Sequence, residues 1–155
     1  MIDQLIILAP LLVLAIVLWL GFTGCSIIYD PDDLPQLRRL TILVRISTAL
    51  EATRIEFGWT EPNGVDGTFT ATNPLPDSTD GGDNVFLHIV TNSATAGAWS
   101  ANCRPRVRDA GGAVDTDNDQ CSFNLDGTEE DSKVTFQASG TPTDGNFTVT
   151  CIGTS

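Results

Sequence analysis

Three arginines at alternate positions are the side chains of this 155-residue chain best suited to recognition chemistry. Arg104, Arg106 and Arg108 lie in the run 98–108, and alternate side chains of a β-strand share one face. Guanidinium groups bind carboxylates and phosphates through paired hydrogen bonds. The spacing therefore predicts a row of positive charge, which is a candidate docking site for the carboxylates of a partner or for lipid phosphates. The alternative is a solvated face that offsets the protein's own acidic loops.

The opposite face of the same run is mostly apolar, with Trp99, Ala101, Cys103 and Val107 at the intervening positions. This division indicates a strand with one side in a core. Pro105 interrupts the run and donates no backbone hydrogen bond, so we expect the strand at the edge of a sheet.

Four cysteines allow three complete pairings, and their spacing alone does not choose between them. We expect a disulfide between Cys103 and Cys121, because both side chains should point inward from strands joined by one connection. Closing that short loop would stabilise the fold by roughly 3 kcal/mol. Cys151 is then either a free thiol in the core or bonded to Cys25 at the membrane surface.

The segment DTDND at 115–119 places carboxylates at Asp115, Asp117 and Asp119, the spacing of positions one, three and five of a calcium loop. It resembles the opening of an EF-hand, and the resemblance implies a calcium site. The segment departs from that pattern at position six, where Gln120 replaces glycine, and no helices flank it. An ordinary acidic turn is therefore the expectation, with no metal bound, and a calcium site is the alternative.

Catalytic chemistry is not expected. The sequence has no serine in a nucleophile-elbow setting and no C-x-x-C pair of metal ligands. His88, the one histidine, lies in a hydrophobic run, where a structural role is expected rather than that of a ligand. We therefore predict a protein that is not an enzyme and uses no cofactor.

The charge balance excludes one class of partner. The chain has 20 Asp and Glu residues against 8 Lys and Arg, a net charge of -12. This charge repels phosphate backbones and anionic lipid heads, so no nucleic-acid partner is expected.

A hydrophobic segment at 5–22 has 18 residues without a charge, LIILAPLLVLAIVLWLGF. As a helix it would cover roughly 27 Å of hydrocarbon, which indicates a membrane span or a long signal sequence. We interpret residues 1–28 as a transmembrane anchor helix.

The end of that segment supports a second interpretation. The four residues Phe22-Thr-Gly-Cys25 resemble the lipobox of bacterial lipoproteins, which implies that Cys25 is lipidated and that the preceding residues are removed. A lipobox normally has leucine where Phe22 stands, and the residues before the span include Asp3 but no lysine or arginine, unlike a secretory signal. A retained anchor is therefore the expectation, and the lipoprotein is the alternative.

After the span, the prolines and aspartates of 29–39 predict an extended juxtamembrane linker, followed by a folded domain at 40–155. Arginines just after the span would by themselves place this domain in the cytoplasm. Cysteines in strand-like runs of a small polar domain favour an oxidising compartment instead. We expect a single-pass protein of the cell membrane with a periplasmic or extracellular domain.

Apolar residues recur at every second position in the folded part, the period of half-buried strands. About eight such runs are separated by clusters of glycine and aspartate: 40–46, 54–59, 68–71, 85–90, 98–107, 120–125, 133–138 and 147–152. This pattern predicts a mainly β fold, an antiparallel immunoglobulin-like sandwich.

Together these features favour a non-catalytic accessory or structural subunit of a larger membrane complex of respiratory, photosynthetic or secretion type. Its partners would be other integral membrane subunits and the lipid bilayer. A pilin-like or virion-associated subunit is the alternative, because type IV pilins share the plan of a helix followed by a β domain. Pilins usually carry glutamate where this chain has Leu5. A lipoprotein binding module acylated at Cys25 is a further alternative.

Overall fold

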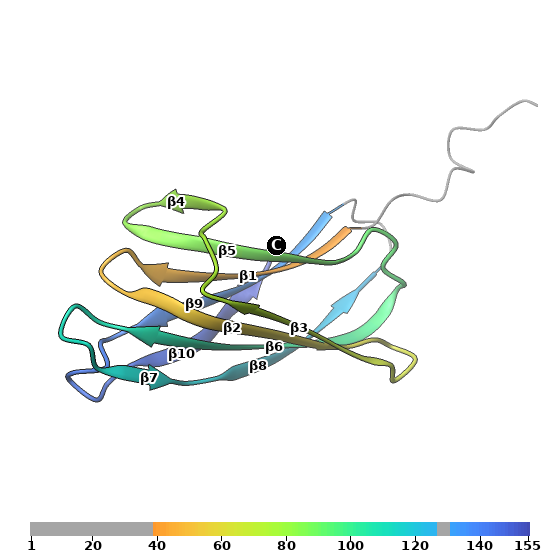
Figure 1. Cartoon of the computed structure of the whole chain (residues 1–155). Helices are drawn as coiled ribbons and strands as arrows, with labels where there is room; N and C mark the ends of the chain where they lie inside the picture. Colours follow the sequence, from red (N-terminus) through yellow and green to blue (C-terminus); the bar gives the residue numbers. More distant parts are fainter. Residues whose placement is uncertain (1–38, 127–130) are drawn as a thin grey trace, which may run out of the picture. The chain divides into compact units, whose positions relative to one another are not determined.

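The computed structural model describes residues 39–126 and 131–155. These residues are mainly β and form two sheets packed as a sandwich (Figure 1). The predicted span at 5–22, the candidate lipidation site Cys25 and the linker up to residue 38 lie outside the described residues. Within the described ranges, no helix has the length and hydropathy needed to cross a membrane.

The eight predicted strand-like runs are all strands in the structure, and two strands of three residues, β4 and β7, add to them. Such short strands leave no visible period in a sequence. The strands are β1 (Arg39–Ser47), β2 (Glu51–Thr60), β3 (Asp66–Thr72), β4 (Ser78–Asp80), β5 (Asp83–Thr91), β6 (Gly97–Arg108), β7 (Val114–Thr116), β8 (Asp119–Leu125), β9 (Asp131–Ser139) and β10 (Thr148–Thr154).

The first sheet, sheet A, has the strand order β10-β9-β1-β5-β4. Its central strand β1 pairs antiparallel with β5 but parallel with β9, so the expectation of an all-antiparallel sandwich is wrong at this pair. Strand β8, which precedes β9 in the chain, belongs to the other sheet. Because β9 is reached by a crossing between sheets and not by a hairpin within sheet A, its direction is not tied to that of β1.

The second sheet, sheet B, has the order β3-β2-β6-β7, and β8 also pairs with β6. Strand β6 therefore lies inside the sheet, and the edge position predicted from Pro105 is wrong. Strands β7 and β8 follow one another along the same side of β6, with pairs Arg106↔Thr116 and Cys103↔Asp119. Pro105 lies opposite the break between β7 and β8. The ladder has fewer hydrogen bonds at this break, so the N–H that proline lacks is not needed there.

The core lies between the two sheets and uses the inward face of nearly every long strand. In β6 buried residues alternate with exposed ones from Trp99 to Arg108, as predicted. The Trp99 indole N–H donates to the carbonyl of Thr95 at 2.9 Å, which satisfies its polar atom. The largest fully buried side chains are Phe136, Leu40, Ile42, Ile46, Ile55, Val44, Val107, Val134, Pro105 and Cys103.

Aromatic rings pack on one side of the core, between β5 of sheet A and β3 of sheet B. His88 of β5 stacks on Phe69 of β3 with ring centroids 4.1 Å apart, and it lies 5.5 Å from Trp59 and 6.3 Å from Phe57. Burial lowers the pKa of His88, because the charged ring would lose water here. Trp59 lies over the backbone of Gly67, its direct cross-strand partner, where a Cβ would collide with the indole.

Candidate functional site

The predicted arginine row lies on the outer face of sheet B. Arg104, Arg106 and Arg108 are all exposed on β6. The neighbouring strand β2 adds Arg54, whose side chain is 51% exposed. We call these four residues the arginine face; they account for half of the eight Lys and Arg residues in the chain.

A β-bulge in β2 determines how the arginines meet. The β2–β6 register shifts between Ala52 and Arg54, which leaves Thr53 as the extra residue and sets Arg54 directly opposite Arg106. The Thr53 hydroxyl donates to the Arg106 carbonyl at 3.1 Å and so fixes the bulge. Two like charges opposite each other on neighbouring strands destabilise a sheet unless an anion lies near them.

Two glutamates partly balance the arginine face. Glu56 forms ion pairs with Arg54 and with Arg104, the latter at 3.7 Å. Glu51 forms an ion pair with Arg108 at 3.3 Å. Arg106 forms no ion pair with any residue of 39–126 or 131–155, so a positive charge remains at the centre of the face.

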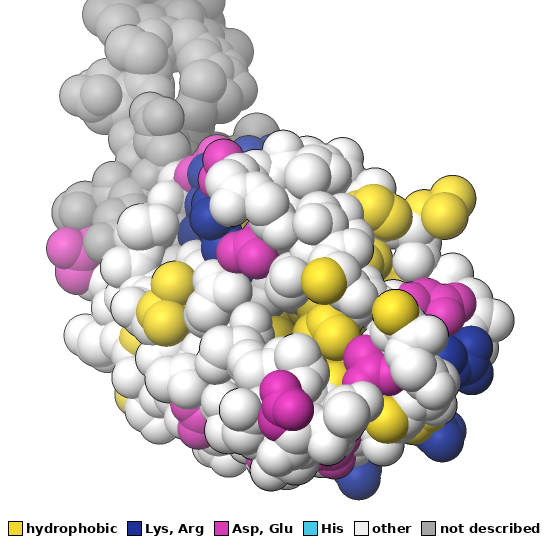
Figure 2. Space-filling model, turned by 90° about the vertical axis from the view of Figure 1, so that its left-hand side faces the viewer, with side chains coloured by type: hydrophobic (Ala, Val, Ile, Leu, Met, Phe, Trp, Pro, Cys, Tyr) yellow, Lys and Arg dark blue, Asp and Glu magenta, His cyan; other side chains and the backbone are white. Residues whose placement is uncertain are grey.

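The surface around Arg106 is hollowed. Two adjoining open hollows of about 390 Å³ and about 350 Å³ share Arg54, Arg106 and the exposed Val114 of β7. Figure 2 looks at one end of the domain and shows dark blue side chains in groups on opposite sides of the view, with acidic side chains beside them. The hollows give a carboxylate or another oxyanion access to two guanidinium groups at once, which favours paired hydrogen bonds.

The three carboxylates of the predicted calcium loop are engaged elsewhere. The Asp117 carboxylate accepts the Val149 N–H at 2.8 Å, and Asp119 accepts the Cys151 N–H at 2.7 Å, whereas Asp115 accepts its neighbour's N–H. Both long-range bonds therefore join the β7–β8 segment to the outer edge of β10.

This arrangement gives no support to the calcium interpretation of Asp115, Asp117 and Asp119. Exposure alternates from residue 113 to residue 125, so the spacing of two that resembles a calcium loop is the period of an extended strand. The described part of the chain also contains no group of three or more His, Cys, Asp or Glu side chains that could hold a metal ion.

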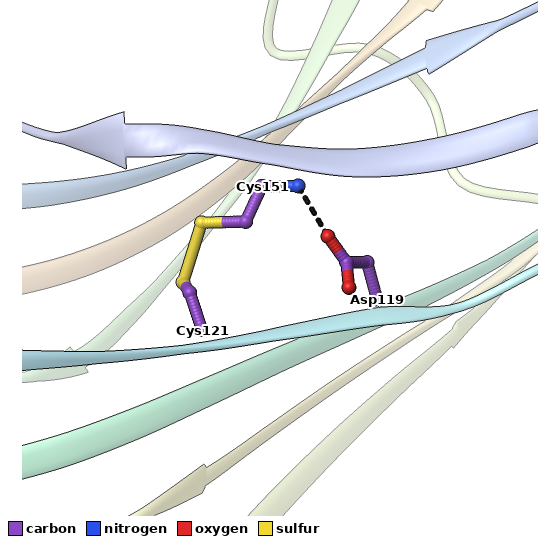
Figure 3. The surroundings of a disulfide bond; sticks show 3 residues. All are labelled: Asp119, Cys121 and Cys151. Atoms are coloured by element: carbon purple, nitrogen blue, oxygen red, sulfur yellow. Dashed lines mark hydrogen bonds between the residues drawn. A yellow bond between two sulfur atoms is a disulfide. The ribbon is translucent and has the colours of Figure 1, made fainter.

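The disulfide joins different residues from those predicted. Cys121 of β8 is bonded to Cys151 of β10, and their Cα atoms are 6.1 Å apart (Figure 3). Cys121 follows Asp119 by two residues on the same strand. The expected bond between Cys103 and Cys121 is therefore wrong. The expectation that Cys151 is a free thiol or is bonded to Cys25 is also wrong, because Cys151 is bonded to Cys121. Cys103 and Cys121 lie on neighbouring strands of one sheet, whereas Cys121 and Cys151 face each other across the two sheets.

Cys103 is a buried free thiol. Burial in apolar surroundings raises its pKa well above the usual value, so the reactive thiolate hardly forms. Its inward direction agrees with the sequence pattern, and its role in the structure is that of a small core side chain.

One interaction at the end of the sandwich has no signal in the sequence. Asp109, after β6, accepts hydrogen bonds from the Thr143 backbone N–H at 3.0 Å, from the Thr143 hydroxyl, and from the Ala113 N–H at 3.0 Å. These bonds connect the β6–β7 turn to the β9–β10 turn. The hydrogen bond from the Thr143 side chain is the main cause that lowers the pKa of Asp109.

Comparison with models of protein families, with curated proteins and with solved structures finds no match to the chain. The arginine face, made of the predicted row on β6 and Arg54 of β2, is therefore identified by its geometry and charge alone.

Proposed function

We propose that the chain is a non-catalytic subunit of a larger membrane protein complex and that its arginine face docks on carboxylates of a neighbouring integral membrane subunit. The supporting observation is the position of Arg106, which faces Arg54 across the strands and has no carboxylate partner within the described residues. A partner carboxylate at this position would relieve the repulsion between the two guanidinium groups.

A protein partner fits this face better than a lipid surface does. A flat anionic membrane would meet the whole domain, whose acidic residues outnumber its basic ones, whereas a single acidic side chain reaches the hollows alone. Planar carboxylates also match the fork of the guanidinium group.

The proposed placement follows from the sequence and the cysteines. The hydrophobic segment 5–22 would anchor the chain as a single transmembrane helix, and the domain would be immunoglobulin-like. The Cys121–Cys151 disulfide favours the oxidising side of the membrane, the periplasm or the exterior.

The test is native mass spectrometry of the full chain, gently extracted from its own membranes. The expected result is an intact chain in fixed stoichiometry with proteins of other mass. A polymer of identical chains would support a pilin-like subunit instead, and a solitary chain that begins at an acylated Cys25 would support a lipoprotein.

Two variants connect the complex to the arginine face. The double change Arg54→Gln and Arg106→Gln should release the partner, and release should also occur in wild type at high salt because exposed charges are screened. The matched control changes Arg39 and Arg45 to Gln, since these arginines lie on sheet A and already pair with Asp131 and Asp80. If the control releases the partner and the double variant keeps it, the arginine face is not the docking surface.

A further inference from the structure

Strand β3 is one of the two edges of sheet B, and its outward backbone groups follow a definite pattern. The Asn73 N–H donates to the Thr53 carbonyl and the Glu61 N–H to the Val65 carbonyl, both at 2.8 Å. The β2–β3 ladder between these two bonds has no register shift. Odd-numbered residues of β3 therefore bond to β2, and Thr68, Thr70 and Thr72 direct their N–H and C=O groups away from the sheet.

Aspartates cover the outward N–H groups at both edges of sheet A. Asp117 and Asp119 accept the outward N–H groups of β10, and Asp77 accepts the Leu87 N–H of β5 at 2.8 Å. Strand β4 is only three residues long. In the described ranges, no side chain accepts the N–H of Thr68 or Thr70, and β3 carries neither lysine nor proline. An edge of this kind is a template for another strand.

The sequence of β3 is nearly symmetric about Phe69. Thr68 and Thr70 flank it, and Gly67 and Ala71 come next, both small. In an antiparallel pair of two β3 strands centred on Phe69, Thr68 faces Thr70 of the other copy as a hydrogen-bonded pair. The two Phe69 rings form the closer, non-hydrogen-bonded pair. Phe69 is 39% exposed in the single chain, so this pairing would cover apolar surface.

We propose that β3 pairs with β3 of a second copy of this chain, antiparallel and centred on Phe69, to form a closed two-fold dimer with a continuous sheet. The contact is self-complementary, as a two-fold interface requires. It is distinct from the arginine face, which lies on the outer surface of sheet B and not at its edge.

The size of this contact determines where the dimer forms. Seven residues of strand span about 24 Å at about 3.4 Å per residue, and pairing along that length buries less than the roughly 1,200 Å² of a stable interface. Chains confined to one membrane reach effective concentrations at which a weak contact is populated. Only this step, the concentration of chains in one membrane, rests on the transmembrane anchor of the proposed function.

The test is disulfide trapping with the full chain in lipid vesicles. Chains with Thr68→Cys and chains with Thr70→Cys, each with its own tag and with Cys25→Ser, are mixed and oxidised. The mixture should give roughly tenfold more cross-linked dimer than either variant alone, because only 68 and 70 lie within disulfide distance. Ile89→Cys, at a site 42% exposed on β5, reports random collisions.

Absence of an excess over the Ile89→Cys control, or cross-linking of Thr68→Cys with itself, would overturn the pairing. Membrane insertion is measured in the same vesicles. If the chain does not insert, the anchor of the proposed function fails, and oxidation of the same mixture at millimolar concentration in solution still decides the pairing. If the cross-link forms and the Arg54→Gln and Arg106→Gln variant still holds its partner, the docking proposal fails and the pairing stands.

Discussion

Arg54 of β2 lies directly opposite Arg106 of β6, and Arg106 forms no ion pair within the described residues. Glu56 balances Arg54 but not Arg106, so this pair gives an incoming carboxylate a place to bind. The bulge at Thr53 produces this pair, because it shifts the register of β2 just before Arg54.

Arg106→Gln should therefore leave stability unchanged or raise it by up to about 0.5 kcal/mol while partner docking falls. Arg108→Gln breaks the ion pair with Glu51 and should lower stability slightly. Urea unfolding measures the free energy and native mass spectrometry measures the docking. A loss of more than about 1 kcal/mol for Arg106→Gln would mean that Arg106 is a structural residue.

Breaking the disulfide should be costly, because it crosslinks the two sheets. The Cys121–Cys151 bond spans 30 residues, and Cys151→Ser should lower the unfolding free energy by roughly 3–4 kcal/mol in the loop-entropy model. Cys103→Ala leaves the bond intact without placing a hydroxyl in the core, so it serves as the control. Digestion without reductant should yield a peptide that joins residues 121 and 151, and one that joins 103 to 121 would contradict the structure.

Asp119→Ala should lower the unfolding free energy by about 1–2 kcal/mol, because it removes the carboxylate that accepts the Cys151 N–H at 2.7 Å. Asp115→Ala should have a smaller effect, since Asp115 bonds only to its neighbour. Millimolar calcium should leave the melting temperature of the wild-type protein unchanged. A calcium-dependent rise that Asp117→Asn abolishes would restore the calcium-loop interpretation.

The turn-to-turn contact of Asp109 should make stability depend on pH. Hydrogen bonds, chiefly from the Thr143 side chain, hold the pKa of Asp109 below its usual value in the folded state. A depressed carboxyl pKa contributes stability above the unfolded pKa of about 3.9, and that contribution is lost as the pH falls through the folded pKa.

Asp109→Asn and Thr143→Val should both reduce the acid-induced loss of stability, measured by urea unfolding between neutral pH and pH 3. Thr143→Val removes the hydroxyl donor and keeps the side-chain shape, so the two variants test the same contact. Identical pH profiles for wild type and both variants would show that the contact does not form in solution.

Proline distinguishes the two sides of β3. Thr70→Pro removes an N–H that points outward, so it should block the β3–β3 dimer at little cost to folding. Ala71→Pro removes an N–H that bonds to β2 and should lower stability by about 3 kcal/mol. Thermal unfolding and co-purification of differently tagged chains measure the two effects. A dimer that survives Thr70→Pro would place the contact elsewhere.

Local patterns in the sequence predicted most of the strands and most of the faces. Alternation at 98–108 correctly placed the arginines outside and Trp99 and Cys103 inside, because the direction of a side chain in a strand depends only on its position along that strand. The same rule accounts for the spacing of Asp115, Asp117 and Asp119, which resembles a calcium loop and is also the period of an extended strand.

The tertiary structure decided which strands meet. Pro105 is compatible with an interior strand only because two separate strands, β7 and β8, share one side of β6 and leave a break opposite it. Cys121 pairs with Cys151 because β8 and β10 lie at facing edges of different sheets, and Arg54 joins the arginine row because a bulge shifts one ladder. These relationships depend on contacts between residues far apart in the chain, and no local period encodes them.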